Sequence, residues 1–330
     1  MLIAIAGAYM GGVFDAWLPK GMKAPGRSSS VTGEGEVTLQ PQDEQLQDKL
    51  QPLISCINSV AIPLGEHAGA YREEYARMLE QPGATRNGQF KMQVFEQNNS
   101  FSRDCIKGLK DAIAMSPADA ALDDPSKQFA DTLEQLIPLM NEADDYYHRK
   151  DNLDDKMKKG KALDSLLMPL FDRFFPAADA LSDVVSERNQ QLRERRLVAL
   201  EQTFGKDNFA WHLLNVSIAA RHAMDGIDAA ASAGTLSADA IETIEKDYQT
   251  AYDAATAFAE AHADTKTSLG NSPVWFSLSS NFNNFLGDVK EFRRLLATKP
   301  NQELVSARLS MLRKDYNDLI RDYNMIARRA

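Results

Sequence analysis

The sequence lacks the short motifs that mark several large enzyme classes. It contains no H-E-x-x-H, no G-x-S-x-G and no G-x-x-x-x-G-K-[ST], the signatures of zinc proteases, serine hydrolases and phosphate-binding loops. It also lacks the E-x-x-H pairs with which di-iron helical bundles hold their metals. Nothing in the residues therefore specifies a reaction.

Basic residues are also in short supply. The 330 residues include 37 Lys and Arg against 47 Asp and Glu, which gives a net charge of -10 and a pI of about 5.1. Nucleic-acid binders gain much of their affinity from basic contacts to phosphates, so this balance argues against a nucleic-acid partner. The hydrophobic fraction of 44% is sufficient to fill a core.

The N-terminal region combines an apolar segment with a polar one. Residues 2–14 are uncharged but shorter than the roughly 20 apolar residues of a spanning helix, and are nearer the core of a signal peptide. No basic residue precedes this run, and no lipid-attachment cysteine follows it. We expect residues 1–18 to be a signal or anchor segment and residues 19–43, rich in Gly, Pro, Ser and charge, to be a flexible tether. The alternative is an exposed apolar helix without a role.

From residue 44 onward, apolar residues recur mostly at steps of three and four, the spacing of one face of an α-helix. No alternating β-branched run with hairpin turn residues occurs. We therefore expect an all-α protein, an antiparallel bundle of about seven long helices. Internal prolines, such as Pro63, should kink some of these helices.

The C-terminal stripe is the clearest of these patterns. Its apolar residues alternate steps of four and three over three heptads, which is the seam of a helix packed nearly parallel to a neighbour. They are Val305, Leu309, Leu312, Tyr316, Leu319, Tyr323 and Ile326. No stretch after residue 44 has the composition of a linker, so we expect residues 44–330 to form one helical domain, or two sub-bundles that meet near residues 203–206.

Cys56 and Cys105 are the only cysteines, and each lies on or beside the apolar face of its predicted helix. If these helices are neighbours, a disulfide would close a loop of about 50 residues and stabilise the fold by roughly 4 kcal/mol. The alternative is a pair of buried thiols, because cysteine is among the most buried residue types. The residues alone leave both open, and an oxidising compartment would favour the disulfide.

The richest polar cluster is EADDYYHRKDNLDDKMKKGK, residues 142–161. Asp144 and His148 are four residues apart, so a helix would place both on one face, where they are candidates for metal ligands. Lysines and arginines neutralise the segment, and the competing interpretation is a solvated helix junction with Tyr147 packed inward. We therefore expect no metal, no other cofactor and no catalytic residue here.

Two further groups of residues carry charge or ring nitrogens. His212 and His222 share a predicted helix, but ten residues separate them by about 15 Å along its axis, so they cannot bind one ion together. Arg193, Arg195 and Arg196 form a basic cluster near the end of a long predicted helix. This cluster suits the negative end of the helix dipole as well as an anionic partner.

Four segments resemble a known family. They are LISCINSVAIPL around Cys56, SFSRDCIKGLKDAI around Cys105, ADDYYHRKDNLDDKMKKGKALDSLL and the terminal DYNDLIRDYN. In this order they are similar to the YiiG-like family, a bacterial domain family of unknown function, over most of residues 44–328. The resemblance implies an all-helical domain exported from the cytoplasm, with members often attached to the envelope as lipoproteins. It also implies that Cys56 and Cys105 pair, and it carries no catalytic signature.

Together these features predict a non-catalytic helical-bundle protein of the periplasm or cell envelope that binds something or has a structural role. One alternative is a periplasmic bundle that binds a metal or small molecule through Asp144, His148 and nearby carboxylates. Another is an enzyme whose site is assembled from separate helices. The expected partner is a protein or a small molecule, and the expected membrane contact is through the N-terminal segment only.

Overall fold

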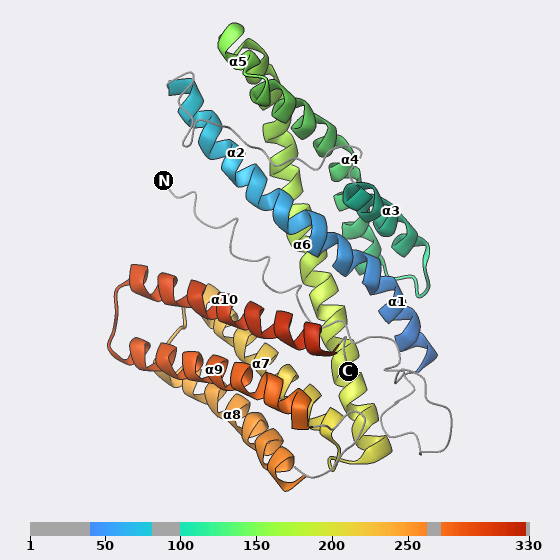
Figure 1. The fold of residues 1–330 in the computed structure, drawn as a ribbon, viewed down its shortest axis with the longest axis vertical. Helices are drawn as coiled ribbons and strands as arrows, with labels where there is room; N and C mark the ends of the chain where they lie inside the picture. Colours follow the sequence, from blue (N-terminus) through green and yellow to red (C-terminus); the bar gives the residue numbers. More distant parts are fainter. Residues whose placement is uncertain (1–39, 81–99, 263–271, 328–330) are drawn as a thin grey trace. The chain divides into compact units, whose positions relative to one another are not determined.

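The computed structural model describes residues 40–80, 100–262 and 272–327, which are almost entirely helical (Figure 1). No strand occurs among them, so the all-α prediction is confirmed. None of the described helices combines the length and the apolar character needed to cross a membrane. The apolar N-terminal segment and most of the expected tether lie outside the described residues.

The first compact unit runs from Pro41 to Arg188. In chain order it contains α1 (Pro41–Cys56), the π-helical turn η2 (Ile57–Ala61), α2 (Ile62–Glu80), α3 (Ser100–Ala114), α4 (Ala120–His148), α5 (Asp151–Asp154) and the N-terminal part of α6 (Lys158–Phe204). α3 packs against both α1 and α4. Pro41 occupies the first helical position, which suits a residue without an N–H group, so α1 begins within the last residues of the expected tether.

The segment from α1 to α2 is helical throughout but contains one wider turn. The sequence predicts a kink at Pro63, and η2 ends two residues before this proline. The N–H of Ile62 donates to the carbonyl of Ile57, five residues earlier, which is the π pattern. Pro63 has no N–H for the carbonyl four residues before it, so the regular α pattern is broken at this point.

The core of the first unit consists of the apolar stripes expected from the sequence. Phe129 of α4 and Phe174 of α6 are both fully buried, and their ring centroids lie 5.7 Å apart. Other fully buried members come from each long helix of the unit: Leu53, Leu64, Leu109, Leu133 and Phe171. Burial of these side chains is the main favourable contribution to folding of this unit.

The second compact unit begins at Asn189. It contains the C-terminal part of α6, then α7 (Phe209–Ser232), α8 (Ala238–Ala261), α9 (Ser272–Ala297) and α10 (Gln302–Ala327). α7 packs against α8, α8 against α9, and α9 against α10, which is the order of an up-and-down bundle. The division between the units falls inside α6, upstream of the turn at residues 203–206 where α6 ends.

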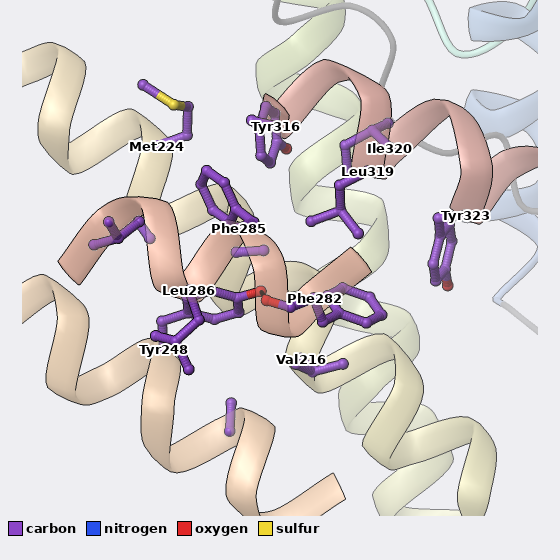
Figure 2. Packing of buried hydrophobic residues seen from close by; sticks show 14 of the residues in the cluster. Val216, Met224, Tyr248, Phe282, Phe285, Leu286, Tyr316, Leu319, Ile320 and Tyr323 are labelled. Atoms are coloured by element: carbon purple, nitrogen blue, oxygen red, sulfur yellow. Dashed lines mark hydrogen bonds between the residues drawn. The ribbon is translucent and has the colours of Figure 1, made fainter. Parts of the chain in front are cut away.

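Aromatic and aliphatic side chains together form the core of the second unit (Figure 2). Tyr248 of α8 is fully buried, and its hydroxyl donates to the carbonyl oxygen of Phe282 at 2.7 Å. The ring centroid of Phe285 lies 5.5 Å from that of Tyr248 and 5.4 Å from that of Tyr316. The predicted seam of the last helix is buried at Leu309, Leu312, Tyr316, Leu319 and Tyr323.

The ends of α7 and α8 follow the local signals of the sequence. Gly234 ends the α7 segment with a φ of 67°, the left-handed conformation expected for a glycine at this place. Ser237 then caps α8, because its hydroxyl accepts the N–H of Ala240 at 3.2 Å. Both ends are therefore set by residue types that favour these positions.

Candidate functional site

Cys56 and Cys105 are joined by a disulfide in the first unit. Cys56 is the last residue of α1, Cys105 lies in α3, and their Cα atoms are 4.5 Å apart. The two side chains are almost completely buried, with exposures of 1% and 4%. The bridge therefore ties α3 to the point where η2 begins, across a sequence separation of 49 residues.

A buried lysine holds the turn between α3 and α4. Lys49 of α1 is completely buried, and its ammonium donates to the carbonyl oxygens of Met115 at 3.1 Å and Pro117 at 2.8 Å. The same nitrogen lies 2.7 Å from a carboxylate oxygen of Asp123, in the first turn of α4. Lys49 thus satisfies carbonyls beyond the end of α3 and a carboxylate at the start of α4. No motif or spacing in the sequence marks Lys49.

A second ion pair fixes the start of α4. Asp119 caps this helix by accepting the N–H of Ala121 at 3.2 Å. The guanidinium of Arg188, from α6, donates to the same carboxylate at 2.7 Å. This hydrogen bond is the main reason that the pKa of Asp119 is lowered. α4 therefore begins at a carboxylate that stays ionised, as the helix dipole favours.

Asp144 and His148, the candidates for metal ligands, lie one turn apart near the end of α4. His148 is exposed and Asp144 is half-buried. Burial raises the pKa of Asp144, and the nearby His148 partly opposes this rise. Across the described ranges, no group of three or more His, Cys, Asp and Glu side chains is placed to hold a metal ion. Within the described residues, the structure therefore brings no third metal ligand to Asp144 and His148.

The junction between α4 and α6 is built around Asp155. Its carboxylate accepts the hydroxyl of Tyr146 at 2.7 Å and the backbone N–H groups of Lys158 and Lys159 at 3.2 and 2.8 Å. The bond from Tyr146 contributes most to the lowered pKa of Asp155, and the N–H groups add to it. Asp155 thus caps the start of α6 and is occupied by that role.

Three buried tyrosines pack at this junction. The ring centroid of Tyr147 lies 4.8 Å from that of Tyr146 and 6.3 Å from that of Tyr71 in α2. Burial raises the pKa of all three phenols, so they stay protonated near neutral pH. Gly160 of α6 makes this packing possible, because a Cβ at that position would lie 2.8 Å from the hydroxyl oxygen of Tyr147. Tyr147 is packed inward, as expected for a solvated helix junction.

Two histidines of the second unit stack on one phenylalanine. The ring of Phe258 lies 4.5 Å from that of His212 and 4.1 Å from that of His262, both close to parallel. His212 is 9% exposed, and burial lowers its pKa. Sequence spacing gave no sign of this stack, because it depends on how α8 packs against α7.

The arginine cluster of α6 does not lie at a helix end. α6 continues to Phe204, about three turns beyond Arg193, whereas the dipole acts within the last turn. Arg193 is 1% exposed and donates to the hydroxyl of Ser217 in α7. Burial also lowers the pKa of Arg196. The dipole interpretation is therefore wrong, and Arg193 serves instead to hold α6 and α7 together.

These features define an all-α protein with two helical units, the first of them closed by a buried disulfide. The chain belongs to the family described as "Protein of unknown function (DUF3829)", which matches residues 44–326. It is similar to the uncharacterized protein YiiG of Escherichia coli (strain K12), with 28% identity over 189 residues. These residues are 56% of this chain and 53% of that protein, so the match spans about half the length of this relative. The resemblance to the YiiG-like family is thereby confirmed, and no solved structure matches.

Proposed function

We propose that this chain is a non-catalytic helical protein of the cell envelope or periplasm that acts through binding or a structural role. The observation that carries this proposal is the disulfide between Cys56 and Cys105. Disulfides form and persist in oxidising compartments and are rare in the cytosol. The two cysteines that the sequence contains are both used in this bridge, which suits a protein that folds outside the reducing cell interior.

Three charged side chains at helix ends support a role without catalysis. Lys49 binds carbonyls beyond the end of α3, Asp119 caps α4, and Asp155 caps α6. A general acid or base has to reach the proton of a substrate. The charged groups of these three residues instead form hydrogen bonds with backbone atoms at helix ends, and these bonds stabilise the fold.

Thiol labelling of the full chain tests the compartment. Cells are lysed in denaturant with an alkylating reagent that blocks free thiols, and the protein is then reduced and labelled with a second reagent. We expect no labelling by the first reagent and two labels after reduction. The Cys56→Ala variant is the matched control, because it leaves Cys105 free to react before reduction. Two thiols that react before reduction in the unchanged protein would overturn the proposal.

Fractionation of the same cells gives an independent measurement. We expect the chain in the periplasmic or envelope fraction, and we expect it to be cleaved by a protease added after the outer layer is opened. A chain that is found only in the cytosolic fraction would contradict the proposal.

A further inference from the structure

Arg196 of α6 is a cation without a counter-charge among the described residues of the second unit. Its side chain is half-buried, and burial lowers its pKa, an effect that the nearby Tyr323 of α10 partly opposes. Within the described part of the chain, no carboxylate pairs with its guanidinium and no acceptor takes a hydrogen bond from it. Taking a guanidinium out of water without a partner is costly. A bound anion would offset this cost.

A second buried arginine lies one turn earlier on the same face of α6. Arg193 is 1% exposed, and its guanidinium donates to the hydroxyl of Ser217 in α7. Residues three apart are neighbours on a helix surface, so the positive charges of Arg193 and Arg196 lie close together. Two cations repel each other more strongly where water is largely excluded, which adds to the benefit of an anion near both.

The acidic residues of this part of α6 face away from Arg196. The part of α6 that belongs to the second unit holds three arginines and two acidic residues, Glu194 and Glu201. With 3.6 residues per turn, these glutamates lie about 160° and about 140° around the helix from Arg196. Each has its own partner, since Glu194 lies 3.0 Å from His222 and Glu201 lies 3.5 Å from Lys206. The helix face that carries Arg196 is therefore positive.

A tyrosine hydroxyl from α10 adds a neutral donor to this group. Tyr323 is 2% exposed and lies at the end of the row of core residues on α10 (Figure 2). Its hydroxyl makes no hydrogen bond with any residue that the structure describes, although buried tyrosines usually find a partner. The adjacent carboxylate of Asp322 accepts a hydrogen bond from Asn281 at 2.6 Å. Tyr323 and Arg196 thus both have donor groups that the described chain does not use.

We propose that Arg196 and Tyr323 bind a small ligand through its carboxylate or phosphate group, with Arg193 adding positive charge. A guanidinium and a phenol both donate hydrogen bonds, and an oxyanion accepts several at once. The planar fork of an arginine also matches the geometry of both oxyanions. This inference rests on the binding role proposed above, but it is tested with purified protein, so its failure would leave the tests of location unaffected.

The first experiment titrates the purified full chain with inorganic phosphate and, separately, with succinate in a calorimeter at constant ionic strength. We expect saturable one-to-one binding of at least one probe, and the ratio of the two affinities tells a phosphate ligand from a carboxylate ligand. Tyr323→Phe should weaken binding about tenfold, and Arg196→Gln about a hundredfold or more. The matched controls in the same unit, Tyr252→Phe and Arg294→Gln, should leave the affinity unchanged.

The second experiment separates ligand binding from a purely structural role by urea unfolding with and without the probe. Without the probe, Arg196→Gln should be at least as stable as the unchanged chain, because it removes an uncompensated charge. At about 100 times Kd, the probe should shift the folding equilibrium of the unchanged chain about 100-fold further than that of Arg196→Gln. This difference cancels the general stabilisation of proteins by phosphate.

Three results would overturn the proposal. The first is that neither probe binds, and the second is that Arg196→Gln binds the probe as well as the unchanged chain does. The third is that Arg196→Gln lowers stability equally with and without the probe, which is the behaviour of an arginine that only holds the fold.

Discussion

Replacement of Lys49 by methionine tests whether the buried lysine is essential to the first unit. Methionine keeps the apolar stem and removes the ammonium group, which the structure places on two carbonyl oxygens and one carboxylate. Lys49 is 0% exposed and its partner Asp123 is 18% exposed. The variant therefore leaves a largely buried carboxylate without its counter-charge.

The size of the effect follows from this burial. Removing one partner of a buried ion pair costs about 3–5 kcal/mol, most of it from the charge left behind. Because the carboxylate of Asp123 retains some contact with water, we expect a loss of about 3 kcal/mol. Adding Asp123→Asn should recover part of this loss, because the remaining group is then neutral.

Urea unfolding followed by circular dichroism measures this loss, with the disulfide kept intact. The matched control is Lys107→Met, which breaks a pair on α3 whose side chains are 73% and 48% exposed. Exposed pairs contribute about 0–1 kcal/mol, so the control should change little. If Lys49→Met costs no more than Lys107→Met, the assignment of Lys49 as a structural buried cation is refuted.

Three further predictions follow from single contacts. Replacing Cys56 and Cys105 together by alanine should lower the free energy of unfolding by about 4 kcal/mol, measured by urea titration against the oxidised chain, because the unfolded state regains the entropy of an open loop. Gly160→Ala should lower the free energy of unfolding by about 1–3 kcal/mol, because the new Cβ overpacks against the hydroxyl of Tyr147. Gly287→Ala is the control, since a Cβ there meets nothing within 4 Å, and it should stabilise α9 by about 0.5–1 kcal/mol. Thermal melts measure both changes. Because burial lowers the pKa of His212, the unfolded chain binds a proton before the folded one does, so stability should fall as the pH drops below about 6.5. His212→Phe should flatten this dependence, and an unchanged pH profile of stability would contradict the assignment.

The helices and their buried faces were largely predictable, because each depends on residues close in sequence. The seam from Leu309 to Tyr323 shows this, since a spacing of three and four on one helix fixes which side chains share a face. The caps at Gly234 and Ser237 are also local. The disulfide was predictable only in part: the apolar faces allowed it, and the family resemblance favoured it over two thiols.

The buried charges were decided by tertiary packing. Lys49 lies on the same helix face as Leu46 and Leu53, but the sequence does not show that a turn from another helix supplies its acceptors. Arg193 looked like a surface cation near a helix end, and the packing of α7 against it made it a buried donor to Ser217. Sequence by itself determined the all-α class and the stripes that form the core, since periodicity is a property of one chain segment. The three-dimensional structure alone decided which polar groups meet, because a hydrogen bond or ion pair depends on atoms brought together from distant parts of the chain.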